Sequence, residues 1–199
     1  INTKKTSSLY TAPTRIFGKT QRKIEKTTIY LVADISGSMR NWMDDVKKEK
    51  REIVEEALYS IVKAATTLPS NKVDLRVLFF DDRAFSRSPR EILQKKFPHP
   101  GGNTCPMAPL QEIAEEQRGK KARVIMITDA EFVESEVLEM EKFIQQHPHL
   151  NFTGVLISSK ITTREMEKKL RIIEESSLWK KFYTIKRTQD LESVFARVL

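Results

Sequence analysis

The stretch Ile29–Arg40, IYLVADISGSMR, joins an apolar run to one carboxylate and two hydroxyls. The apolar and β-branched residues over 27–33 predict a strand that is covered on both faces. Asp34, Ser36 and Ser38 follow that strand directly. Because ligands in α/β proteins bind outside the carboxyl ends of parallel strands, these three side chains are candidates for a functional site.

The rest of the chain alternates strand patterns with helix patterns. Further strands are predicted at 73–80, 83–87, 122–129, 152–158 and 181–185, and helices at 42–66, 107–117, 134–146, from the capping box Thr162-x-x-Glu165, and at 188–198. The short segment 83–87 follows a tight Asp81-Asp82 turn and is predicted to be an antiparallel edge strand. The alternation indicates an α/β fold with a doubly wound, Rossmann-like, mostly parallel six-stranded sheet and helices on both faces.

A doubly wound sheet places two distant carboxylates side by side. With the strand order 3-2-1-4-5-6, the order reverses between the first and fourth strands. The first strand ends at Asp34, and the fourth, ARVIMITD over 122–129, ends at Asp129. We therefore expect Asp34 and Asp129 to be neighbours at the carboxyl edge of the sheet.

Two neighbouring carboxylates repel each other unless a cation lies between them. The other oxygen ligands available are the hydroxyls of Ser36, Ser38 and Thr104, which follows the Gly101-Gly102 pair. An all-oxygen set suits a hard divalent cation, Mg²⁺ first, with Mn²⁺ or Ca²⁺ as alternatives. Because neutral hydroxyls leave the ion under-neutralised, it should attract a carboxylate from outside the chain.

These residues resemble a known motif. Asp34-x-Ser36-x-Ser38, Thr104 in GGNT and Asp129 in ITDAE are similar to the metal-ion-dependent adhesion site (MIDAS) of the von Willebrand factor A (VWA) domain family. The resemblance implies a VWA domain over 27–199, preceded by a basic arm over 1–26. It also implies that the five side chains hold Mg²⁺, directly or through water, and that a partner protein contributes an Asp or Glu.

The chain departs from the family pattern after Asp129. Ala130 stands where the family usually has Gly, and Glu131 adds a carboxylate near the site. Intracellular members of the family commonly act as adaptors, often beside AAA+ ATPases. The resemblance therefore implies a protein–protein adaptor rather than an enzyme, with an AAA+ ATPase as a partner class.

Composition limits the location and the partners. The single cysteine, Cys105, excludes an internal disulfide and favours a cytoplasmic protein, and no apolar run approaches the roughly 20 residues of a membrane span. The net charge of +8 is concentrated at the two ends, because residues 1–27 carry seven Lys/Arg and one Glu and residues 160–199 carry ten basic and six acidic groups. Nucleic-acid binding through these ends is the alternative function.

A hydrolytic enzyme is a third possibility that the residues disfavour. A G-x-S-x-G nucleophile elbow is absent, because Asp34 and Ser38 stand at the glycine positions around Ser36. An Asp-x-Asp phosphatase would need a carboxylate in place of Ser36. The three histidines lie in loop segments next to prolines, so no general base is evident.

Overall fold

The computed structural model describes residues 26–44, 46–67, 72–157 and 182–185. The sheet has the order β5-β4-β1-β6-β7-β8. Its strands are β1 (Thr27–Asp34), β4 (Val73–Phe80), β5 (Ala84–Arg87), β6 (Ala122–Thr128), β7 (Leu150–Ile157) and β8 (Phe182–Ile185). The pairing of β4 with β5 is antiparallel, and the other pairings are parallel. The predicted α/β class, the mostly parallel sheet and its antiparallel edge strand are confirmed.

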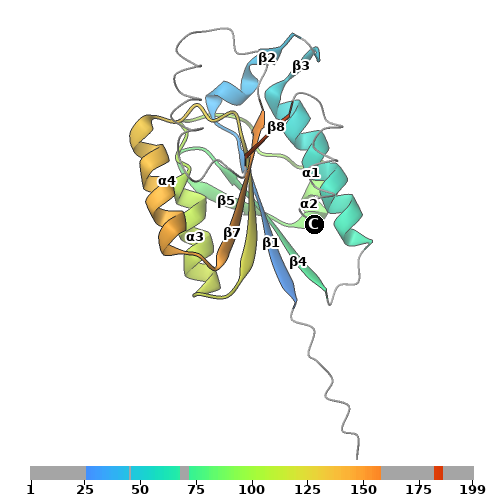
Figure 1. Ribbon diagram of the computed structural model, residues 1–199. Helices are drawn as coiled ribbons and strands as arrows, with labels where there is room; N and C mark the ends of the chain where they lie inside the picture. The colour runs from blue at the N-terminus through green and yellow to red at the C-terminus, as the bar shows by residue number, and fades with distance from the viewer. Residues whose placement is uncertain (1–25, 45, 68–71, 158–181, 186–199) are drawn as a thin grey trace, which may run out of the picture.

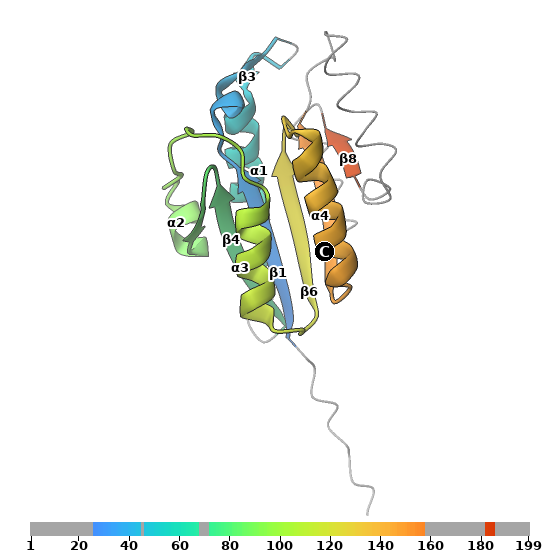
Figure 2. The same cartoon turned by 90° about the vertical axis from the view of Figure 1, so that its left-hand side faces the viewer.

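Helices cover both faces of this sheet (Figures 1 and 2). One face carries α1 (Lys50–Thr66) and α2 (Pro89–Leu93), and the other carries α3 (Met107–Gln117) and α4 (Glu134–Gln146). None of the helices in the described part of the chain has the length and apolar character to cross a membrane. The helices predicted after Thr162 and at 188–198, and the arm over 1–26 apart from Lys26, lie outside the described residues.

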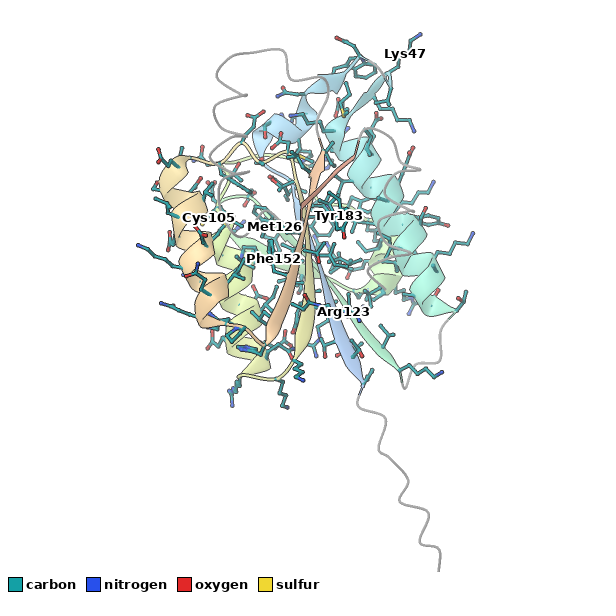
Figure 3. All side chains as sticks on the ribbon, in the orientation of Figure 1. Lys47, Cys105, Arg123, Met126, Phe152 and Tyr183 are labelled. Atoms are coloured by element: carbon teal, nitrogen blue, oxygen red, sulfur yellow. The ribbon has the colours of Figure 1, made fainter. Side chains whose placement is uncertain are left out.

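Alternation along β1 divides the core into two layers. Ile29, Leu31 and Ala33 belong to a buried cluster with the apolar side chains of α1, whereas Tyr30 and Val32 belong to a second cluster with α3 and α4. Side chains fill the space between the sheet and the helices on both sides (Figure 3). Since β1 is buried on both faces, its carboxyl end has a fixed position.

The region before α1 corrects the sequence prediction. A helix was expected over 42–66, but α1 begins at Lys50, and the preceding residues form a two-stranded hairpin of β2 (Trp42–Met43) and β3 (Lys48–Glu49). Lys47 adopts a left-handed conformation with φ 54°, which a continuous α-helix does not allow. Trp42 is 55% exposed on the hairpin.

The strand order confirms the predicted meeting point. β1 lies between β4 and β6. Strands are added outward from β1 in both directions, with β4 and β5 on one side and β6, β7 and β8 on the other. Ala33 pairs with Ile127, so the next residue on each strand, Asp34 and Thr128, lies at the same carboxyl edge. The edge between β1 and β6 is therefore the switch point at which α/β folds bind ligands.

Candidate metal centre

Asp34 is fully buried at the end of β1 and accepts two short hydrogen bonds. The backbone N–H of Ser36 donates to Asp34 Oδ1 at 2.8 Å, and the Thr128 hydroxyl donates to Asp34 Oδ2 at 2.6 Å. These bonds fix the carboxylate between β1 and β6. Each carboxylate oxygen has a further lone pair, so Asp34 can still bind a cation directly or through water.

The two serines follow Asp34 on one tight loop. Ser36 is 1% exposed, and its Oγ lies 3.0 Å from the Oγ of Ser38. Ser38 belongs to η1 (Gly37–Arg40), a single 3₁₀ turn whose N-cap residue is Ser36. The predicted pair of hydroxyls is thus gathered beside the Asp34 carboxylate.

The loop that carries Thr104 is docked against this turn. Gly101 N donates to the Ile35 carbonyl at 2.9 Å, Gly37 N donates to the Gly102 carbonyl at 3.2 Å, and the Arg40 guanidinium donates to the Pro100 carbonyl. Thr104 is partly buried, two residues beyond Gly102. The hydrogen bonds therefore hold the threonine loop beside the serine loop, although 65 positions separate Ser38 from Asn103.

The Asp81-Asp82 turn has a role that the sequence did not reveal. It connects β4 to β5 as predicted, and Asp81 N donates to the Arg83 carbonyl at 3.1 Å. The same turn also holds the threonine loop, because Asn103 N donates to Asp82 Oδ1 at 3.0 Å and Cys105 N donates to the Asp81 carbonyl at 2.8 Å. Thr104 is thereby fixed on both sides.

Asp129 is buried at the end of β6 and is already paired with a cation of this chain. The Lys50 ammonium lies 2.6 Å from Asp129 Oδ2 and 3.4 Å from Glu131 Oε1. The Lys50 side chain is 3% exposed, and Glu131 is 36% exposed. The sequence prediction did not include Lys50, because a lysine in a long amphipathic helix pattern is typical of a solvated face.

Electrostatics at the edge of the sheet favour a further positive charge. Burial, and then repulsion by Asp129, raise the pKa of Asp34 to about 6, although the hydrogen bonds from Thr128 and Ser36 act in the opposite direction. A carboxylate with a raised pKa is one whose negative charge is incompletely compensated. Lys50 contacts Asp129 rather than Asp34.

The oxygen donors fit a hard cation. Two buried carboxylates and the three hydroxyls offer only oxygen atoms, the ligand type of Mg²⁺, Mn²⁺ and Ca²⁺. In the described part of the chain no three His, Cys, Asp or Glu side chains are grouped to hold a metal. A soft-metal site is therefore not found there, and a cation at this edge would depend on the hydroxyls.

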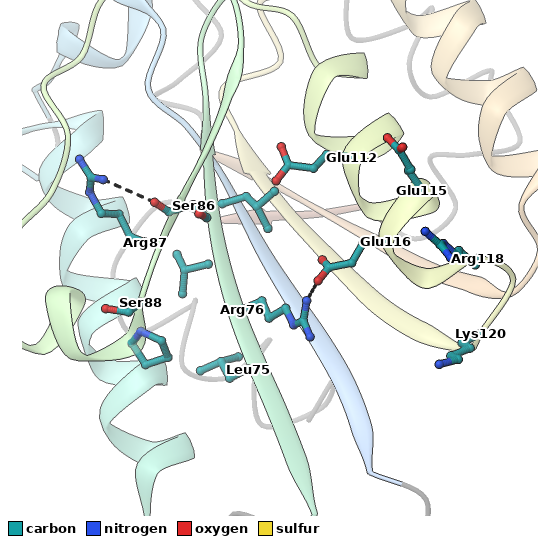
Figure 4. A pocket seen from close by; sticks show the side chains of 13 residues that line it. Leu75, Arg76, Ser86, Arg87, Ser88, Glu112, Glu115, Glu116, Arg118 and Lys120 are labelled. Carbon is teal, nitrogen blue, oxygen red and sulfur yellow. Dashed lines mark hydrogen bonds and ion pairs between the residues drawn. The ribbon is translucent and has the colours of Figure 1, made fainter.

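A concave region lies beside the middle of β4 (Figure 4). This region, here called the α3 groove, has a volume of about 820 Å³ and lies between α3 and the β4–β5 edge. Its lining includes Arg76, Arg87, Glu112, Glu115, Glu116, Arg118 and Lys120. The lining carries both signs of charge, and Arg76 is ion-paired with Glu116.

Comparison with known proteins bears on the fold. No protein-family model and no curated protein matches the sequence. Solved structures that do match include the PilB minor pilin from Streptococcus sanguinis, with a TM-score of 0.63, 11% identity, and coverage of 87% of this chain and 60% of that one. This chain therefore spans less than two thirds of that pilin.

Two further matches were solved with metal ions. The manganese-loaded TRAP protein of Plasmodium vivax has a TM-score of 0.56 and 20% identity, covering 86% of this chain and 71% of that one. Proximal thread matrix protein 1 from the mussel byssus, with a zinc-occupied MIDAS motif, has a TM-score of 0.55 and 17% identity. The match covers 88% of this chain and 45% of that one. The chain has a VWA-like fold. At these identities the similarity shows the fold alone, and the roles of the five side chains are argued from their placement.

Proposed function

We propose that this chain is a metal-dependent protein-binding module. Asp34, Ser36, Ser38, Thr104 and Asp129 would hold a divalent cation, Mg²⁺ in the first place, and the cation would bind an Asp or Glu of a partner protein. The observation that carries the proposal is the docking of the threonine loop on the Asp34 loop at the β1–β6 switch point. VWA-like structures that hold manganese and zinc support a divalent cation in general.

Each side chain has a distinct task in this mechanism. The hydroxyls supply neutral ligands, and the two buried aspartates supply the negative charge that attracts the ion. When bound, the metal supplies a positive charge with a coordination position for a partner's carboxylate. Ser36 N and Thr128 hold Asp34 in one orientation, and the Asp81-Asp82 turn holds the threonine loop, so Asp34 and this loop reorganise little on binding.

The remaining features of the proposal come from the sequence. We propose a cytoplasmic adaptor without catalytic activity, and an AAA+ ATPase is the partner class that the family resemblance implies. His147 and His149 precede β7 and so lie at its amino end, away from Asp34. The nucleic-acid alternative depends on basic ends that lie almost entirely outside the described residues.

Metal binding tests the proposal directly. Isothermal titration of the full chain with Mg²⁺ and Mn²⁺ should detect a single site, and Thr104→Ala should weaken it by about 10–100-fold or more, the range seen when support for a metal is removed. Thr66→Ala is the matched control, because the Thr66 hydroxyl is exposed on α1 and bonds only the Lys63 carbonyl. Equal affinity of Thr104→Ala and the unaltered chain would contradict the assigned site.

Partner binding is tested by co-purification with and without EDTA. A partner that binds through the metal should be lost in EDTA, return with Mg²⁺, and be lost from Asp34→Asn. This substitution preserves the shape of the Asp34 side chain, so circular dichroism should show a folded protein. A partner that remains bound in EDTA would show that the interaction does not use the metal.

A further inference from the structure

Lys50 is the buried charge that the proposed metal site does not require. Lysine is almost never fully buried unless it is paired, and here the ammonium is in contact with Asp129 and Glu131. Asp129 is one of the two buried carboxylates assigned to the metal. The same carboxylate therefore has two candidate cations, one fixed in the chain and one from solution.

We propose that the Lys50 ammonium is an internal cation of this site that competes with the divalent ion for Asp129 and so lowers the affinity for metal. This inference rests on the proposed function. The Asp129 Oδ2 lone pair that accepts the lysine N–H is not available to a metal ligand or a metal-bound water. The ammonium and the ion also repel each other in a buried environment, where charges are weakly screened.

The backbone holds Lys50 at this place. Lys50 N donates to the Asn41 carbonyl at 3.1 Å, and Asn41 N donates to the Ser38 carbonyl at 2.9 Å. The lysine is thus anchored to the same turn that presents the Ser38 hydroxyl. Glu52 Oε2 accepts a hydrogen bond from Glu49 N at 3.0 Å, which fixes the start of α1. The ammonium is therefore held at the site by the surrounding backbone, unlike a lysine on a solvated surface.

Removing the ammonium should strengthen metal binding. Lys50→Met keeps an unbranched apolar side chain but removes the ammonium, so Mg²⁺ should bind Lys50→Met ~10-fold more tightly or better, a factor equal to the lower end of the pKa shifts that an adjacent opposite charge causes at a carboxyl group. Lys50→Arg, which keeps the charge, should retain the weak affinity of the unaltered chain.

Lys48→Met is the matched control for net charge. Lys48 lies two residues away, is 40% exposed and pairs with Glu56 at the surface, so its removal should leave the affinity unchanged. Titration of the full chain distinguishes the hypotheses. Tighter binding by Lys50→Met supports both, equal or weaker binding overturns the role of Lys50 alone, and no metal binding by any variant overturns the metal site and the inference together.

A measurement on the unaltered chain decides the question if Lys50→Met fails to fold. Lysine acylation followed by mass spectrometry reports how accessible each amine is. In EDTA the Lys50 amine should be protected by burial and pairing, and saturating Mg²⁺ should raise its labelling while leaving Lys48 unchanged. Unchanged protection of Lys50 in saturating Mg²⁺ would overturn the competition.

Discussion

The carboxyl edge of β1 and β6 and the α3 groove hold similar side chains in opposite environments. At the edge, Asp34, Asp129 and Lys50 are almost completely buried, and their contacts join the ends of β1 and β6 and the start of α1. In the groove, Arg76 and Glu116 are 39% and 42% exposed. Water screens the groove charges, so their pairs contribute little, whereas each charge at the edge needs a specific partner.

The difference in burial indicates which charged side chains are candidates for a functional role in this fold. An exposed pair can form or break at low cost, so its presence does not predict a ligand. A buried lysine between two carboxylates has a large desolvation cost and persists only because the surrounding structure fixes it. Substitutions in the two regions should therefore have effects that decrease as the affected group becomes more exposed.

The largest effect on stability is expected from Lys50→Met in EDTA. Removing the ammonium leaves the buried Asp129 charge without its partner, which should lower the free energy of unfolding by ~3–5 kcal/mol. Urea unfolding measures this change, and Lys48→Met provides the exposed comparison. If both substitutions have the same small effect, the Lys50–Asp129 pair does not stabilise the domain.

Tyr30→Phe tests a group that connects the buried core to the groove. Tyr30 is fully buried, accepts a hydrogen bond from Gln117 Nε2 at 2.6 Å and donates to Glu116 Oε2 at 2.7 Å. Loss of the hydroxyl leaves the buried Gln117 amide unpaired, and the free energy of unfolding should fall by ~1–3 kcal/mol. Thermal unfolding should show this loss, with Tyr59→Phe as the half-buried control and metal affinity unchanged in both.

Gly102→Ala tests the docking of the threonine loop. Gly102 has φ 68°, and an added Cβ would lie 2.6 Å from Asp82 Oδ2, on the side chain that holds Asn103. The left-handed conformation alone should cost ~1–2 kcal/mol, and the displaced loop should weaken Mg²⁺ binding. Gly101→Ala is the matched control, because nothing lies within 4 Å of its added Cβ. Equal Mg²⁺ affinity of the two variants would show that the position of the threonine loop does not affect metal binding.

Much of the fold could be predicted because it depends on local patterns. The apolar runs of β1, β4, β6 and β7 identify strands, and the crossover rule then places Asp34 beside the end of β6. The start of α1 could not be predicted, because 42–49 has a helix-compatible pattern, whereas β2 and β3 form a hairpin there and Lys47 is left-handed. The short α2 was not predicted, although Ser88 caps it and Pro89 stands at its start.

The candidate site also contains residues that the sequence could predict and residues that it could not. Asp34, Ser36 and Ser38 share one turn and could be found from their spacing, and the structure places Asp129 and the threonine loop beside them. The partners of these residues depend on tertiary structure. Thr128 has the pattern of an ordinary β-branched strand residue, yet its hydroxyl bonds Asp34, and Lys50 meets Asp129 across 79 positions. No local pattern contains such contacts.

The smallest effect is expected from Glu116→Gln in the α3 groove. The substitution removes the charge that pairs with Arg76 but retains an oxygen that can accept the Tyr30 hydrogen bond. Because both side chains are more than one third exposed, the free energy of unfolding should change by only ~0–1 kcal/mol, and the change should shrink further in high salt. Urea unfolding at low and high ionic strength measures it. A loss as large as that of Lys50→Met would mean that the groove charges are shielded from water, and the contrast between the two regions would then fail.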